Sequence, residues 1–123
     1  MSKKILIVDD EPNIIISLEF LMKKEGFTVA VAGDGDEALA KAASFEPDLV
    51  LLDVMMPKKS GFEVCEALRA DPARAGLQIV MLTAKGRDTE VAKGLAIGAD
   101  AYVTKAFSTK DLLAKVKAML GVA

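Results

Sequence analysis

Residues 49–53 read LVLLD: four consecutive apolar residues followed directly by a carboxylate. An unbroken apolar run of this length is typical of a strand buried on both faces, as strands are in parallel sheets. Residues 5–10 repeat the pattern as ILIVDD, with two aspartates after the run. We therefore predict two buried strands that each stop at acidic side chains.

Outward from these two strands, short apolar runs alternate with segments of helical periodicity. Three more strands are predicted at residues 28–32, 79–82 and 101–104. This alternation of five strands and five helices indicates an α/β fold, in which a parallel sheet carries helices on both faces. The five helices are predicted to open at Pro12, after Gly35, at the capping box of Ser60 and Glu63, around Val91, Ala92 and Leu95, and at Ser108.

Length and composition bound the class of protein. The 123 residues fit one domain without a visible linker or repeat, so a single domain over residues 1–123 is expected. No apolar run approaches the ~20 residues of a membrane span, so no membrane association is expected. The single cysteine, Cys65, fits a reducing cytoplasm, and a net charge of −2 gives no general reason to bind nucleic acid. The chain has no histidine, which removes the usual neutral-pH acid/base group.

Polar residues follow four of the five predicted strands: Asp9 and Asp10, Asp53, Thr83, and Lys105. The carboxyl ends of parallel strands meet at one edge, where ligands bind in such sheets. Clustered carboxylates repel one another, and Mg²⁺ with its oxygen ligands would relieve that repulsion. A carboxylate there can also act as a nucleophile, while a lysine and a hydroxyl would stabilise phosphoryl oxygens.

Each of these residues also has a simpler interpretation when taken alone. Asp9 or Asp10 could be the N-cap of the first helix, since aspartate is strongly preferred there. Lys105 could be a solvated surface lysine, Thr83 an ordinary strand residue, and Tyr102 part of the core. The coincidence of polar residues at four strand ends is what favours a functional site.

Six short motifs then stand in order along the chain: residues 7–11 (IVDDE), 51–57 (LLDVMMP), Gly61, 82–84 (LTA), 98–102 (GADAY) and 104–105 (TK). Together they resemble the receiver domains of bacterial response regulators, the phosphorelay regulators of two-component systems. The resemblance implies a single doubly wound, flavodoxin-like domain with strand order 2-1-3-4-5. It also implies a phosphoacceptor regulator rather than an enzyme with turnover.

The resemblance further implies a role for particular residues. Asp53 matches the residue phosphorylated by a sensor histidine kinase or phosphotransfer protein. Asp10, Asp53 and the carbonyl of Met55 match the ligands of Mg²⁺, with Asp9 reaching the ion through water. Lys105 matches the lysine that pairs with a phosphoryl oxygen.

The resemblance also implies an output. Thr83 and Tyr102 match the switch residues, which change partner binding through the face of the fourth helix, fifth strand and fifth helix. The expected partners are a downstream effector protein or a fused output domain, with a possible homodimer. Dimerising members often carry two acids before the tyrosine, whereas here Asp100 is followed by Ala101.

One departure bears on the chemistry. The family usually has a proline joined by a cis peptide after the lysine, and this chain has Ala106. A cis bond before a non-proline residue costs roughly 2.5–4 kcal/mol, so we predict a trans bond and an altered path beyond Lys105. If the loop relaxes, Lys105 still reaches the site through its four methylenes, which is the interpretation we favour. If it does not, the alternative function is a receiver-like binding module with impaired phosphorylation.

Two enzyme-like or cofactor-binding alternatives fit less well. A phosphatase with an aspartyl nucleophile would place a second acid two residues after it, where this chain has Met55. A flavin-binding electron carrier of the same topology would hold phosphate on the loop after the first strand. Residues 9–11 (DDE) would repel that phosphate.

Overall fold

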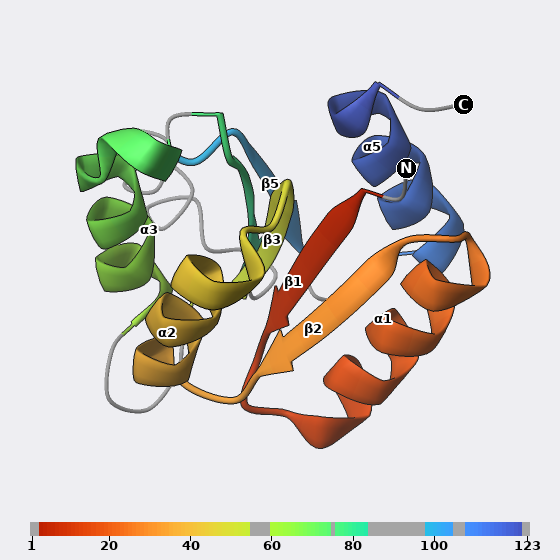
Figure 1. Ribbon diagram of the computed structural model, residues 1–123. Helices are drawn as coiled ribbons and strands as arrows, with labels where there is room; N and C mark the ends of the chain where they lie inside the picture. The colour runs from red at the N-terminus through yellow and green to blue at the C-terminus, as the bar shows by residue number, and fades with distance from the viewer. Residues whose placement is uncertain (1–2, 55–59, 75, 84–97, 105–107, 122–123) are drawn as a thin grey trace.

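The computed structural model describes residues 3–54, 60–74, 76–83, 98–104 and 108–121. The predicted α/β fold is confirmed, with four α-helices in this part of the chain (Figure 1). The helix predicted around Val91, Ala92 and Leu95 lies outside the described residues. The strands are β1 (Lys4–Val8), β2 (Thr28–Ala32), β3 (Leu49–Asp53), β4 (Gln78–Thr83) and β5 (Ala101–Thr104). The helices are α1 (Pro12–Lys24), α2 (Gly35–Phe45), α3 (Gly61–Ala70), the short 3₁₀ helix η1 (Pro72–Arg74) and α5 (Thr109–Leu120).

The five strands form one parallel sheet in the order β2-β1-β3-β4-β5, as the resemblance implied. β3 is the central strand and pairs with β1 on one side and β4 on the other. Val8 at the end of β1 is opposite Leu52, and Asp53 is opposite Leu82. The acidic ends of β1 and β3 therefore reach the same edge of the sheet at the same level.

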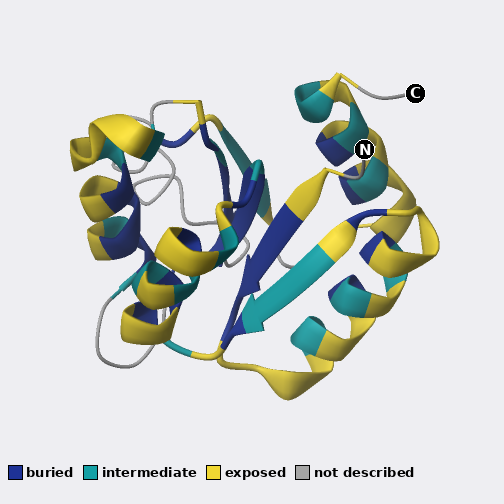
Figure 2. Ribbon diagram, viewed as in Figure 1, coloured by how far each residue is buried: buried dark blue, intermediate teal, exposed yellow. Residues whose placement is uncertain are grey.

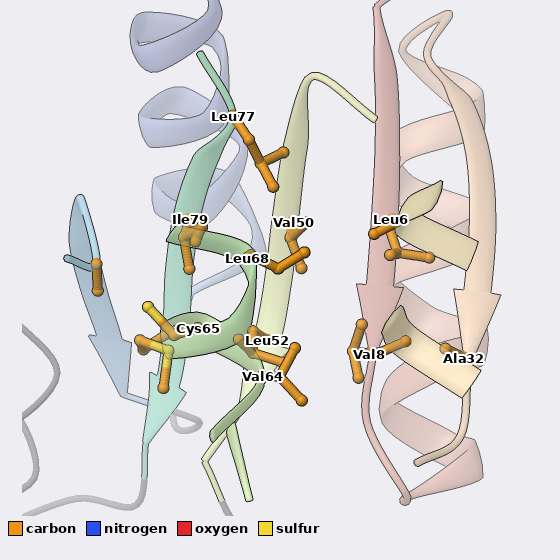
Figure 3. Packing of buried hydrophobic residues seen from close by; sticks show 14 of the residues in the cluster. Leu6, Val8, Ala32, Val50, Leu52, Val64, Cys65, Leu68, Leu77 and Ile79 are labelled. Carbon is orange, nitrogen blue, oxygen red and sulfur yellow. The ribbon is translucent and has the colours of Figure 1, made fainter. Parts of the chain in front are cut away.

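Side-chain alternation along the strands divides the interior into two cores. Figure 2 shows that β1 is largely buried, and Figure 3 shows residues of one of the two cores. Leu6 and Leu52 belong to the core that includes Val64 and Cys65 of α3. Ile7 and Leu51 belong to the opposite core, which packs against α1 and α5. Residues 5–8 of β1 and 49–52 of β3 are buried on both faces of the sheet, and for this reason they form unbroken apolar runs.

The helix starts follow local sequence chemistry. Ser60 caps α3 by accepting a hydrogen bond from the backbone N–H of Glu63 at 3.2 Å, and the Glu63 carboxylate accepts one from the Ser60 N–H. This is the capping box that the sequence predicted. α2 has Asp34 as its N-cap, bonded to the N–H of Glu37 at 2.8 Å. These caps fix where each helix leaves the edge of the sheet.

Candidate functional site

Three carboxylates meet at the carboxyl edge of the sheet. One oxygen from each of Asp9, Asp10 and Asp53 lies within 4.8 Å of the others. Asp9 and Asp53 are buried, with 0% and 2% of their surface exposed, whereas Asp10 is exposed. The structure thus brings together the three acids that the sequence placed at two strand ends.

Backbone contacts hold Asp9 in place. Its N–H donates to the carbonyl of Ala32 at the end of β2, at 3.1 Å. Its Oδ1 accepts a hydrogen bond from the N–H of Glu11 at 2.9 Å, which closes a tight turn after β1. The N-cap of α1 is Glu11, so the interpretation of Asp9 or Asp10 as the cap of this helix is wrong.

Asp53 is the last residue of the central strand. The N–H of the next residue, Val54, donates to the carbonyl of Leu82 at 3.1 Å, which continues the pairing with β4. The carbonyl of Val54 accepts from the N–H of Gly61, the first residue of α3, at 2.8 Å. The backbone around Asp53 is therefore held by β4 on one side and by the start of α3 on another.

The electrostatics of the cluster call for positive charge. Two carboxylates about 5 Å apart repel by roughly 3 kcal/mol at an effective dielectric constant of about 20. Because Asp9 and Asp53 are buried, keeping either carboxylate ionised also carries a desolvation cost. A bound cation would offset both costs.

The chemistry of the donor set selects the kind of cation. All three donors are carboxylates, and the chain contains no histidine to serve as a nitrogen ligand. Oxygen-only donors suit hard ions such as Mg²⁺, Ca²⁺ and Mn²⁺ rather than zinc. Three carboxylates leave part of an octahedral shell for water or a phosphate oxygen, so the residues fit a magnesium-type site.

The remaining predicted site residues are only partly described. Thr83 ends β4 opposite Thr104, so its backbone lies on the same edge as Asp53, and nothing is described of its side chain. Tyr102 in β5 is half-buried and packs against the core on the α3 side of the sheet. Met55 and Lys105 lie outside the described residues, as does Ala106, so their predicted roles and the trans peptide stay predictions.

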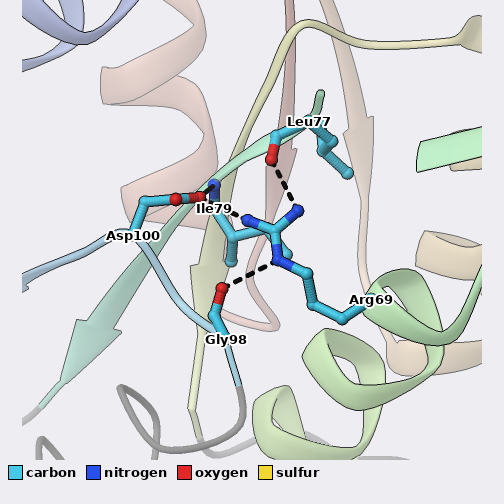
Figure 4. Close-up of polar contacts among 5 residues, drawn as sticks. All are labelled: Arg69, Leu77, Ile79, Gly98 and Asp100. Atoms are coloured by element: carbon cyan, nitrogen blue, oxygen red, sulfur yellow. Dashed lines mark hydrogen bonds and ion pairs between the residues drawn. The ribbon is translucent and has the colours of Figure 1, made fainter. Parts of the chain in front are cut away.

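A polar network built on Arg69 was not predicted from the sequence (Figure 4). Its Nε donates to the carbonyl of Gly98 at 2.8 Å and its Nη1 to that of Leu77 at 2.7 Å. Its Nη2 pairs with the carboxylate of Asp100, which also accepts from the N–H of Ile79 at 2.7 Å. Arg69 thereby ties the end of α3 to the starts of β4 and β5.

A doubly wound parallel sheet with a carboxylate cluster at its carboxyl edge defines the class: α/β proteins that bind their ligands at that edge. The family described as "Response regulator receiver domain" matches residues 5–117. This chain therefore belongs to the response regulator receiver domains, which act in two-component signalling as phosphoacceptors.

Individual relatives agree with this family. The chain is 48% identical over 120 residues to the alkaline phosphatase synthesis transcriptional regulatory protein PhoP of Bacillus subtilis, covering 98% of this chain and 49% of that protein. It is also 48% identical over 120 residues to the DNA-binding response regulator MtrA of Mycolicibacterium smegmatis, covering 98% and 51%. The chain thus spans about half the length of these curated relatives.

Solved structures share the fold over the full domain. A putative response regulator from Chloroflexus aurantiacus superimposes with a TM-score of 0.93 at 33% identity, covering 98% of this chain and 99% of the other. The BeF₃-activated DrrB receiver domain gives 0.89 at 35% identity, covering 98% and 99%. In the described residues, none of the helices has both the length and the apolar character to cross a bilayer.

Proposed function

We propose that residues 1–123 form one receiver domain that accepts a phosphoryl group on Asp53 and thereby works as a signalling switch. The observation that carries this proposal is the carboxylate cluster at the carboxyl edge of the sheet, with Asp53 buried at the end of the central strand. The hydrogen bond from the N–H of Glu11 holds the Asp9 carboxylate in place, and Asp10 is exposed to solvent. Both acids therefore suit the binding of an ion. The family resemblance supports Asp53 as the acceptor.

The phosphoryl donor is a sensor histidine kinase or a phosphotransfer protein. A carboxylate oxygen of Asp53 attacks the phosphorus of a phosphohistidine, so that an O–P bond forms as the P–N bond breaks. The electron pair of the broken bond returns to the imidazole, which takes up a proton. The lysine and hydroxyl expected from Lys105 and Thr83 stabilise the phosphoryl oxygens during this transfer.

The proposed cofactor is Mg²⁺, held by Asp9, Asp10, Asp53 and the carbonyl of Met55. When bound, it neutralises charge on the carboxylates and on the phosphoryl oxygens. Without a counter-charge, the phosphoryl group on Asp53 would carry roughly two negative charges beside the carboxylates of Asp9 and Asp10. The acidic cluster therefore supports a magnesium-dependent reaction.

The proposed output is a change of partner binding through β5, α5 and the segment expected to form the fourth helix. Phosphorylation biases the positions of Thr83 and Tyr102, and a downstream effector protein or a fused output domain reads the result. The names of the two curated relatives, and the half of their length that lies beyond the match, support a fused domain.

A homodimer on this face would lack one acidic contact, because Ala101 follows Asp100. The chain has one cysteine, Cys65, and therefore no disulfide framework, which supports a location in the reducing cytoplasm.

The test is phosphorylation with acetyl phosphate, followed by intact-protein mass spectrometry with and without Mg²⁺. We expect wild type to gain one phosphoryl group only with the metal, and Asp53→Asn to gain none. Labelling of Asp53→Asn at the wild-type rate would refute Asp53 as the acceptor. Sustained turnover of p-nitrophenyl phosphate would favour a phosphatase instead.

The alternative function, a binding module with impaired phosphorylation, has its own discriminating variant. Ala106→Pro restores the residue that the family usually has after the lysine. If wild type is labelled slowly and Ala106→Pro quickly, the alternative is supported. Equally fast labelling of the two proteins supports a functional switch with a relaxed loop at Ala106.

A further inference from the structure

Gly61 lies closer to the backbone of Asp53 than any residue with a side chain could. A Cβ at this position would stand 2.2 Å from the carbonyl oxygen of Asp53. It would also stand 2.9 Å from the carbonyl carbon of Asp53 and 2.9 Å from Cα of Val54. All three contacts are with backbone atoms, so no side chain can rotate away to make room.

Neither partner in this contact can move cheaply. Asp53 belongs to the central strand and is paired with Leu82 of β4. On the other side, α3 is fixed to the core by Val64 and Cys65, both with 0% of their surface exposed. An added methyl group must therefore tilt the peptide after Asp53 or push back the first turn of α3.

We propose that Gly61 is a positioning residue for Asp53: its missing side chain lets α3 dock against the acceptor backbone and so sets where the Asp53 carboxylate stands. Asp9 and Asp10 come from the end of β1, so they do not follow a displacement at β3. The separations within the cluster, which bring all three oxygens within 4.8 Å, therefore depend on this contact in addition to the pairing of β3 with its neighbours. Mg²⁺ tolerates little change, because it demands near-octahedral ligands at about 2.0–2.1 Å. This inference rests on the proposed role of Asp53 as phosphoacceptor.

The test compares Gly61→Ala with two control variants. Gly76→Ala adds the same methyl group where it meets nothing within 4 Å. Val64→Ala loosens the packing of α3 without adding an atom near Asp53. Each protein is assayed for Mg²⁺ affinity by titration calorimetry and for acetyl phosphate labelling at saturating Mg²⁺, with rates corrected for the folded fraction from circular dichroism.

Gly61→Ala is expected to weaken Mg²⁺ binding about tenfold, as changes beside metal ligands do. Its labelling rate should fall by about 100-fold, a loss that a misplacement of about 1 Å can cause. Gly76→Ala and Val64→Ala should match wild type per folded molecule. Wild-type affinity and rate in folded Gly61→Ala would overturn the inference, and so would an equal loss in Val64→Ala.

Two further outcomes are informative. If Gly61→Ala is poorly folded, trimethylamine N-oxide is added to all samples to restore the compact state. A variant that stays unfolded overturns the inference, because the glycine then serves the whole fold rather than the position of Asp53. If wild type is not labelled at all, the proposed function fails, while the difference in Mg²⁺ affinity between Gly61→Ala and Gly76→Ala still decides the role of Gly61.

Discussion

Replacing Arg69 with methionine should destabilise the domain by about 3 kcal/mol, because its guanidinium bonds two backbone carbonyls and the Asp100 carboxylate. The side chain is 20% exposed and donates to the carbonyls of Gly98 and Leu77 at 2.8 and 2.7 Å. Hydrogen bonds from charged donors contribute about 1.5–3 kcal/mol each, and we take the lower value because the site is not fully buried. The Asp100 carboxylate is 37% exposed, so solvent screening holds the ion pair below about 0.5 kcal/mol, and the total of about 3 kcal/mol comes from the two carbonyl bonds alone.

This loss is measured by urea unfolding followed by far-ultraviolet circular dichroism. In a domain of 123 residues, about 3 kcal/mol corresponds to a fall in Tm of roughly 12 °C. Methionine keeps the apolar stem, so the difference reports the guanidinium rather than lost packing. Arg74→Met makes the same chemical change in η1. Arg74 contacts the network through its backbone carbonyl, which accepts from the N–H of Leu77, so a change of its side chain should cost less than about 0.5 kcal/mol.

A double-mutant cycle with Asp100→Asn separates the ion pair from the carbonyl bonds. Asparagine can still accept from the N–H of Ile79, so the coupling free energy between positions 69 and 100 should be well below the total loss. Unfolding of Arg69→Met within about 0.5 kcal/mol of wild type would refute the reasoning. So would a coupling energy that accounts for the whole loss.

Three further predictions concern single residues. A hydrogen bond and charge attraction from Lys117, at 2.7 Å, hold the pKa of Glu25 below its usual value of 4.5. This contact should stabilise the domain above that value and be lost as the pH falls through the lower folded-state pKa. The gap in urea midpoint between wild type and Glu25→Gln should therefore close in acid, and a gap independent of pH would contradict this. Glu46 has a left-handed backbone with φ of 53° at the end of α2, so Glu46→Gly should stabilise by about 1 kcal/mol, and a lowered urea midpoint would disprove it. Burial raises the pKa of the Cys65 thiol, so iodoacetamide should modify it slowly in the native state and rapidly in urea; equal rates would disprove burial in solution.

Much of the fold was predictable, because buried parallel strands leave a direct mark on the sequence. The predicted run at residues 49–52 became β3, which extends one residue further to include Asp53. The run at 79–82 became β4, one residue longer at each end. The start of α3 was also predicted, since a capping box is a local pattern that needs no tertiary contact.

The carboxylate cluster was predictable for a different reason: parallel topology alone brings strand ends together. The capping interpretation of Asp9 and Asp10 was wrong, because the chain first bonds to the end of β2 and turns before α1 begins at Pro12. The Arg69 network escaped prediction because its partners Gly98 and Asp100 lie 29 and 31 residues away, with no local signal. The close approach of Gly61 to Asp53 likewise exists only in three dimensions.

The strand register at the centre of the sheet sets a limit on how this sequence can vary in length. Val8 and Leu52 are paired, and each is followed at once by an acidic residue of the cluster. Inserting or deleting one residue in either run would offset the two acids by about 3.3 Å, the rise of one strand residue. That offset exceeds the whole distance of about 2.0–2.1 Å between Mg²⁺ and a ligand oxygen. Apolar exchanges within residues 5–8 and 49–52 are therefore compatible with the cluster, whereas a change in the length of either run is not.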